Sequence, residues 1–234
     1  MRRFAWGALL AVGALCASGA ASPAPAATYA GALFRYWSFS NGNDLRDPIL
    51  YWMPGPFHVS LEYWDFVLGQ DQFRPELGLH LRDRRRSSYT LQWRHERQDE
   101  RFWAGTEQVA ADHWVVRAEV SPLVFADSTL VVWDAGADYY WGSYNFAGVT
   151  VIRDPRGSDL WVVPARVRLA NERNDWFQVT VAPASRRTLG WAVEGKLGIV
   201  RAGIERNSRF DFTNADNLIF TAGIEVPVPA LPTP

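Results

Sequence analysis

The stretch SYTLQWRHERQDERFWAGTEQ, residues 88–108, decides the fold class, because the character of its side chains alternates. In its first half, apolar side chains take every second position and polar side chains the positions between: Tyr89, Leu91 and Trp93 against Thr90, Gln92, Arg94 and Glu96. A strand shows this period of two when its faces meet different surroundings. The apolar face meets either a protein core, as in a soluble β protein, or lipid, as in a membrane barrel.

The same alternation recurs along the chain, between connections rich in Gly, Pro, Asp, Asn and Arg. Further alternating segments are residues 57–66, 77–82, 113–121, 160–170, 176–182, 189–196, 200–206 and 217–228. Several have about nine to eleven residues, the length of a tilted membrane-spanning strand. Residues 129–142 fit either one bent strand or two, so we expect about twelve antiparallel strands.

The N-terminal region has the features of a cleaved signal peptide. Two arginines follow Met1, an apolar run covers residues 4–17, and Ala-Pro-Ala at 24–26 fits a cleavage site. The apolar run is shorter than the roughly 17–25 residues of a membrane-spanning helix. The lone cysteine, Cys16, falls in this region, so disulfides cannot hold the remainder together. The expected organisation is a signal peptide at 1–26, a β domain at 27–228 and a Pro-rich tail at 229–234.

Composition narrows the choice of surroundings. A net charge of −1 gives no electrostatic support for a nucleic-acid partner. Twelve tryptophans in 234 residues is a high content, and Trp and Tyr favour membrane–water boundaries. Candidates for such boundary positions lie near the starts and ends of expected strands: Trp64, Trp103, Trp114, Trp161 and Trp176. The alternative is a secreted or periplasmic β protein that binds carbohydrate through Trp and Tyr.

The charged faces of the strands favour a barrel with a polar interior. An arginine at the bilayer midplane costs roughly 2–4 kcal/mol, so a lipid-facing strand keeps its arginines inside. The residues expected to line the lumen are Arg94, Glu96, Arg117, Glu119, Arg166, Arg168, Arg201 and Glu205. If the lumen conducts, its arginines would favour anions. In such a barrel we expect Arg94→Gln to be mild.

Two stretches carry a resemblance to a known family: YYWGSYNFAGVTVIRDPR (139–156) and WVVPARVRLANERNDWFQVTVAP (161–183). With the strand rhythm and the signal peptide, they resemble small Gram-negative outer-membrane barrels, in particular the YaiO-like outer-membrane β-barrel family. The resemblance covers most of the chain after the signal peptide. It implies an antiparallel transmembrane barrel in the bacterial outer membrane, in contact with lipid and lipopolysaccharide and inserted by the barrel-assembly machinery. Such barrels usually end on an aromatic residue, whereas the last strand here ends in Glu225-Val226-Pro227-Val228.

Catalysis is a further alternative, because some outer-membrane barrels hydrolyse lipids. SFSNGN (38–43) is similar to the serine segment of outer-membrane phospholipases, but Ser38 stands where the activating histidine would be. His58 and Ser60 have the spacing of lipid A deacylases, but Leu61 stands where an Asn usually follows, so a polar strand face is the favoured interpretation of both. The other histidines have no metal-ligand spacing. We therefore expect no catalytic residues, no metal and no cofactor, and a structural role or passage or binding of small polar or anionic solutes or surface glycans.

Overall fold

The regular structure of the chain consists of strands. The computed structural model describes residues 28–228, apart from residues 70, 83–87, 97–98, 126, 142–143, 156–159, 186–188 and 208–215. The proposed signal peptide and the Pro-rich tail lie outside this part of the chain. Within it, no helix is long and apolar enough to cross a bilayer.

The described residues form fifteen strands, most of them seven to thirteen residues long. They are β1 (Tyr29–Phe39), β2 (Leu45–Met53), β3 (Phe57–Phe66), β4 (Gln72–Arg82), β5 (Ser88–Glu96), β6 (Asp99–Ala111), β7 (Trp114–Val124), β8 (Thr129–Trp141), β9 (Asn145–Asp154), β10 (Leu160–Val162), β11 (Ala165–Ala170), β12 (Trp176–Ala182), β13 (Gly190–Leu197), β14 (Val200–Arg206) and β15 (Asn217–Pro227). Each pairs antiparallel with its neighbours.

The sheet closes on itself. Strand β1 pairs with β2 on one side and with β15 on the other, and β9 pairs with both β8 and β11. Short β10 continues β11 in one register along β9, because Val162 opposes Ile152 and Ala165 opposes Val149. Pro164, which has no amide hydrogen, lies in the interruption between them. The described ring is thus a closed antiparallel barrel of fourteen strands, an even number as in single-chain bacterial outer-membrane barrels.

The expectation of about twelve strands is therefore too low. The segments that sequence alternation missed are β1, β2, β6 and β9. In β1, both faces are apolar, with Phe34 outside and Trp37 inside, so no period of two is visible. Residues 129–141 form one strand, β8.

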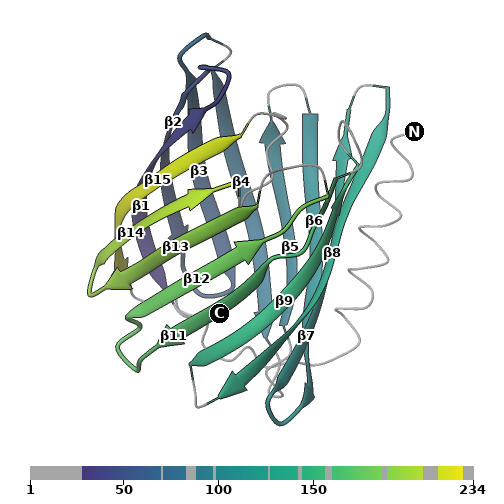
Figure 1. Cartoon of the computed structure of the whole chain (residues 1–234), viewed down its shortest axis with the longest axis vertical. Coiled ribbons are helices and arrows are strands. Elements are labelled where there is room, and N and C mark those ends of the chain that lie inside the picture. The colour runs from purple at the N-terminus through teal and green to yellow at the C-terminus, as the bar shows by residue number, and fades with distance from the viewer. Residues whose placement is uncertain are drawn as a thin grey trace.

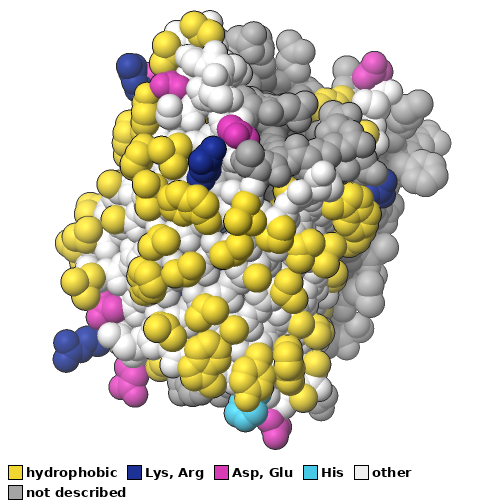
Figure 2. All heavy atoms as spheres, in the orientation of Figure 1, with side chains coloured by type: hydrophobic (Ala, Val, Ile, Leu, Met, Phe, Trp, Pro, Cys, Tyr) yellow, Lys and Arg dark blue, Asp and Glu magenta, His cyan; other side chains and the backbone are white. Residues whose placement is uncertain are grey.

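The outer face of the ring is apolar. Figure 2 shows hydrophobic side chains across the visible wall, with charged side chains near its edges. The exposed members alternate with inward-facing polar residues: Leu50, Phe73 and Leu77 on β2 and β4, and Val167, Leu169, Phe177 and Val179 on β11 and β12. In Figure 1, the front strands β11–β14 run obliquely across the strands behind them, as in a tilted, sheared barrel. Alternation therefore sorts the side chains into an apolar exterior and a polar interior.

The two ends of the barrel differ in their connections. The end that carries residues 40–44 also carries the longest connection, residues 207–216. At the opposite end, the connections have five residues or fewer, such as 112–113 and 198–199. Short turns at one end and longer loops at the other are typical of outer-membrane barrels, where the short turns face the periplasm. We refer to these ends as the loop end and the turn end.

Hydrogen bonds from backbone amides to carboxylates order both ends. At the turn end, the amide of Gly198 donates to Asp175 at 2.6 Å, and this bond holds the pKa of Asp175 below its usual value. At the loop end, Asp44 accepts from the Tyr36 hydroxyl and from the amide of Phe39 at 3.0 Å; the Tyr36 bond is the main cause of the lowered pKa of Asp44. A lowered folded-state pKa means that both carboxylates stabilise the fold near neutral pH and lose this contribution in acid.

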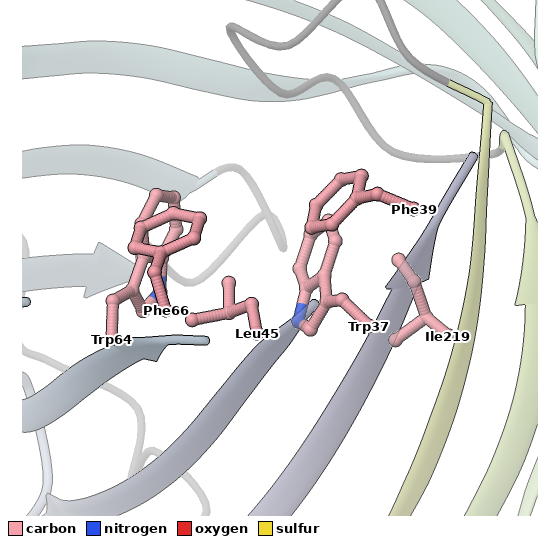
Figure 3. Packing of buried hydrophobic residues seen from close by; sticks show 6 residues of the cluster. All are labelled: Trp37, Phe39, Leu45, Trp64, Phe66 and Ile219. Carbon is pink, nitrogen blue, oxygen red and sulfur yellow. The ribbon is translucent and has the colours of Figure 1, made fainter. Parts of the chain in front are cut away.

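An aromatic cluster fills part of the interior near the loop end. It consists of Trp37, Phe39, Leu45, Trp64, Phe66 and Ile219, all buried, from β1, β2, β3 and β15 (Figure 3). The rings of Trp37 and Phe39 stack with centroids 5.9 Å apart, and Trp64 meets Phe66 edge-on at 5.8 Å. Such contacts add to the stability gained by burying apolar area. This side of the interior is therefore packed with side chains.

The apolar exterior predicts the effect of a charge placed on it. Leu77 lies in the middle of β4 and is 52% exposed, so Leu77→Arg puts a guanidinium among lipid tails. We expect a loss of roughly 2–4 kcal/mol in the free energy of unfolding, measured by urea titration in lipid vesicles. Leu68→Arg is the control, because Leu68 is 72% exposed in the connection between β3 and β4. Equal, small effects of both substitutions would contradict a lipid-facing band.

Candidate functional site

The interior of the barrel carries a network of ion pairs centred on Glu62. This carboxylate lies on β3 and is buried. Its Oε1 accepts from Arg35 of β1, and its Oε2 accepts from Arg74 Nη1 of β4 at 3.0 Å. Arg94 Nη1 of β5 lies 3.7 Å from the same Oε2. Three arginines from three strands therefore converge on one carboxylate.

Two further buried carboxylates balance these arginines. Arg35 Nε donates to Asp47 Oδ2 at 2.7 Å, and Arg94 Nε donates to Glu76 Oε2 at 2.6 Å. Glu76 Oε1 also lies 3.2 Å from His58 Nδ1. We call this set the paired-charge wall; its members are Arg35, Asp47, His58, Glu62, Arg74, Glu76 and Arg94. Its three arginines match its three carboxylates, so it has little net charge to offer a passing solute.

A second group joins β7, β8, β9 and β11. Arg117 holds both oxygens of Asp138 at 2.8 and 3.0 Å and also donates to Thr150 Oγ1 at 2.9 Å. Arg166 Nη2 reaches Asp138 at 3.2 Å from the other side. Gly148 makes this arrangement possible, because a Cβ there would lie 1.6 Å from Asp138 Oδ1. Two arginines share this one carboxylate, and Glu107 faces Arg117 across β6 and β7.

A third group lies on β11–β15 towards the turn end. Lys196 Nζ pairs with Glu225 Oε1 at 3.0 Å, and Tyr51 donates to Glu225 Oε2 at 2.8 Å. Arg201 Nη2 contacts Glu194 Oε2 at 3.2 Å. The ring of Trp176 lies beneath two guanidinium groups, those of Arg168 at 4.3 Å and Arg201 at 5.4 Å from its centroid. Cations favour the face of an indole ring because of its quadrupole.

Some charged side chains of the interior have no opposite charge within ion-pair distance among the described residues. Arg168 makes no hydrogen bond or ion pair there; its guanidinium lies over the Trp176 ring, with Glu194 as a more distant opposite charge. Glu119 and Asp134 face each other across β7 and β8, and neither has a hydrogen bond or ion pair to a described residue. An unpaired charge is tolerable where water or a solute reaches it. The positive and negative members lie on different parts of the wall, so the interior is polarised.

A cavity of about 270 Å³ opens between the paired-charge wall and β14–β15. Its lining includes Tyr29, Tyr51, His58, Ser60, Arg201 and Glu225. The interior beside the paired-charge wall is therefore not completely filled by side chains.

The predicted lumen residues lie on the inner face of the ring in seven of eight cases. Each of the seven lies on the same strand face as residues that are buried or ion-paired. They are Arg94, Arg117, Glu119, Arg166, Arg168, Arg201 and Glu205. The side chain of Glu96 lies outside the described residues. The structure separates these residues into different groups: Arg94 in the paired-charge wall, Arg117 and Arg166 around Asp138, and Arg168 and Arg201 at Trp176.

The prediction of boundary aromatics needs correction. Trp114 and Trp161 are 47% and 40% exposed on the outer face. Trp64, Trp103 and Trp176 instead point into the barrel, where arginines cover their rings. Arg74 lies 3.6 Å from the Trp64 centroid, and Arg101 lies 4.4 Å from that of Trp103. The prediction is wrong for these three because it used only their position near a strand end and not the face of the strand on which they lie. Trp64, for example, lies on the same face of β3 as Ser60 and Glu62.

The arrangement of His58 and Ser60 gives no support to a lipid hydrolase. Both lie on the inner face of β3, with Ser60 buried and His58 Nδ1 against Glu76. A lipid ester in the bilayer would meet the opposite face of that strand. Among the described residues, no three His, Cys, Asp or Glu side chains are placed to hold a metal ion together.

Sequence reasoning missed the residues at the centre of the paired-charge wall. Alternation across residues 57–66 already put Glu62 on the polar face. Arg74 and Glu76 precede the segment that was recognised at 77–82, although they are in phase with its polar side. Asp47 was missed because the sequence pattern did not reveal strand β2. Extending the alternation of residues 77–82 towards the N-terminus would have placed Arg74 and Glu76 on the polar face of the strand.

Comparison with known proteins agrees with this architecture. No protein-family model matches the chain, and no curated protein matches it in sequence. Among solved structures, the chain is similar to the outer membrane protein Omp33 of Acinetobacter baumannii, with a TM-score of 0.51, 10% identity and coverage of 86% of this chain and 98% of that one. It is also similar to the Pseudomonas putida toluene transporter TodX, with a TM-score of 0.50, 7% identity and coverage of 86% and 89%.

The fold is therefore that of bacterial outer-membrane β-barrels. In such a ring, backbone groups bond to neighbouring strands, so an apolar exterior can lie in lipid without exposing unsatisfied polar groups. The outer face described above has this apolar character. The fold and this exterior together place the chain in the bacterial outer membrane.

The network reverses the expectation that Arg94→Gln is mild. Arg94 pairs with buried Glu76 and lies near buried Glu62, so its loss leaves carboxylates without their cation. We expect a loss of about 3–5 kcal/mol in the free energy of unfolding. Arg168→Gln removes the same charge from the interior but breaks no ion pair, and should cost about 1 kcal/mol or less. Urea unfolding of both variants in vesicles, followed by tryptophan fluorescence, measures the difference; equal losses would contradict this account of the network.

Proposed function

We propose that this chain forms an outer-membrane channel that passes small polar solutes, with a preference for anions along one side of its lumen. The observation that carries the proposal is a closed barrel whose interior keeps unpaired charges of both signs, Arg168 on one side and Glu119 and Asp134 on another. Unpaired interior charges are stable when water fills the space beside them. The fold shared with outer-membrane barrels supports the same function.

The packing of the interior limits solute size. The aromatic cluster and the paired-charge wall occupy much of the side of the lumen formed by β1–β5, and the 270 Å³ cavity is the space left beside them. What remains for a solute is the space towards β7–β14, where Glu119 and Asp134 lie on β7 and β8 and a group richer in positive charge, Arg166, Arg168 and Arg201 with Glu194, lies on β11–β14. A solute small enough for this space, and anionic, would be stabilised there.

The finer expectations from the sequence belong to the same proposal. We propose membership of the YaiO-like family, removal of residues 1–26 on export, insertion by the barrel-assembly machinery, and contact of the outer band with lipid and lipopolysaccharide. A soluble carbohydrate-binding protein fits less well, because many large apolar side chains are exposed over contiguous strands. A purely structural barrel remains the outcome if no solute passes.

Membrane integration is tested by fractionation. We expect the protein to stay with the outer-membrane fraction after a carbonate wash and to change its gel mobility when boiled, because the ring opens only on heating. Leu68→Arg serves as a control that should behave like the wild type. Release by carbonate would contradict an integral barrel and favour the soluble alternative.

Solute passage is tested with the refolded full chain in planar lipid bilayers. We expect discrete current steps, and a reversal potential in a potassium chloride gradient that shows a preference for chloride. Arg168→Gln should shift the reversal potential towards cations, because it removes an unpaired positive charge from the lumen. A folded, inserted barrel without current would contradict the channel; a cation preference in the wild type would contradict its charge assignment.

A further inference from the structure

We infer that Arg168, Trp176 and Arg201 form a saturable binding site for a small oxyanion, the carboxylate or phosphate group of a solute. The inference deepens the proposed function and rests on it in one respect: the solute must reach the lumen. It differs from a general preference for anions, because it assigns one site, one stoichiometry and one functional group.

The first step is the state of Arg168. Among the described residues, its guanidinium has no carboxylate within ion-pair distance and no hydrogen bond, and it lies over the Trp176 ring at 4.3 Å from the centroid. Arg35, Arg74, Arg94 and Arg117 each have a carboxylate within ion-pair distance. Stacking on an indole fixes the plane of a guanidinium but leaves its in-plane N–H donors free. Arg168 is therefore held in place with its donors available.

The second step is Arg201, on the same ring. Its guanidinium carbon is 5.4 Å from the Trp176 centroid, so the two guanidinium groups lie within about 10 Å of each other. Nη2 of Arg201 contacts Glu194, whereas Nη1 donates to no described residue, and the side chain is 24% exposed. An accessible guanidinium donor without a protein acceptor can bind a ligand oxygen. The available donors thus come from two side chains positioned by one aromatic ring.

The third step is the local charge. Lys196 is directly opposite Trp176 in the strand register and pairs with Glu225, and Arg201 pairs with Glu194. With Arg168 added, three cations face two carboxylates. The excess is one positive charge, which a single bound anion neutralises. Repulsion between Arg168 and Arg201 is relieved at the same time.

The fourth step is the available space. Gly203 lies on the inner face of β14, between Glu194 of β13 and Thr221 of β15, and contributes no side chain there. A Cβ at this position would lie 2.9 Å from the Cβ of Glu194. Arg201 also forms part of the wall of the 270 Å³ cavity, together with Tyr29 and Tyr51. Of the three site residues, Arg201 is the one that lines this cavity, so a small solute there would bring its anionic group to Arg201 and its remaining atoms to the two tyrosines.

Guanidinium groups suit oxyanions because their N–H donors match the two oxygens of a carboxylate or two oxygens of a phosphate. The site therefore takes a small organic acid or a small phosphate ester, bound through its anionic group, with its remaining atoms towards Tyr29 and Tyr51. Neutral sugars of the same size lack the charge that the site requires.

The test is equilibrium binding to the refolded full chain in detergent, by isothermal titration calorimetry at constant ionic strength. Sodium acetate, sodium benzoate and inorganic phosphate are the probes, with sodium chloride as the competing salt. We expect saturable binding of one anion per barrel and, for Arg168→Gln, a Kd raised at least about tenfold by the loss of charge-assisted hydrogen bonds. Arg46→Gln is the matched control, because Arg46 is an exposed arginine paired with Asp65 at 3.3 Å; its Kd should equal that of the wild type.

The outcomes separate this inference from the channel proposal. Saturable binding that Arg168→Gln and Arg201→Gln weaken, in variants that keep heat-modifiable mobility, supports the site, and the probe that binds tighter identifies carboxylate or phosphate. Wild type that binds none of the probes, or an equal loss in Arg46→Gln, overturns it. Current in bilayers without binding rejects only the site, whereas binding without current rejects only the channel.

Discussion

The pairing of β1 with β15 is the constraint on which the rest of the molecule depends. Tyr29 opposes Pro227 and Phe39 opposes Asn217, so the first and last strands are joined over their full length. Without this pairing, two strand edges would expose backbone donors and acceptors, which lipid cannot satisfy. Closure also creates an inside, and only an inside allows buried arginines and carboxylates to meet across five neighbouring strands.

The interior is asymmetric because charged and aromatic side chains are paired differently on its two sides. On β1–β5, apolar rings and matched ion pairs occupy much of the space and join neighbouring strands. On β7–β14, charges are matched incompletely, and the ring of Trp176 holds Arg168, which has no carboxylate within ion-pair distance among the described residues. The first side stabilises the ring, and the second leaves charge available to a solute. One barrel thus separates stability from recognition around its circumference.

Sequence patterns carried the fold class, the polarity of the two faces and the inner position of most candidate lumen residues. They could do so because a period of two follows directly from strand geometry. They failed for β1, whose inner face is as apolar as its outer face, and for Trp64, Trp103 and Trp176, whose inner position depends on arginines of neighbouring strands. Partner choice across strands, such as Arg74 with Glu62, depends on register, which alternation within one strand does not contain.

The contact between Gly148 and Asp138 has a consequence for how this barrel can change. The space for the Asp138 carboxylate is the space that any side chain at position 148 would occupy. A relative that acquires even alanine there must shorten or remove the acid, and then Arg117 and Arg166 would both lose their shared anion. These four positions on β7, β8, β9 and β11 are therefore free to vary only as a set, and their joint substitution would convert a neutralised part of the wall into a strongly cationic one.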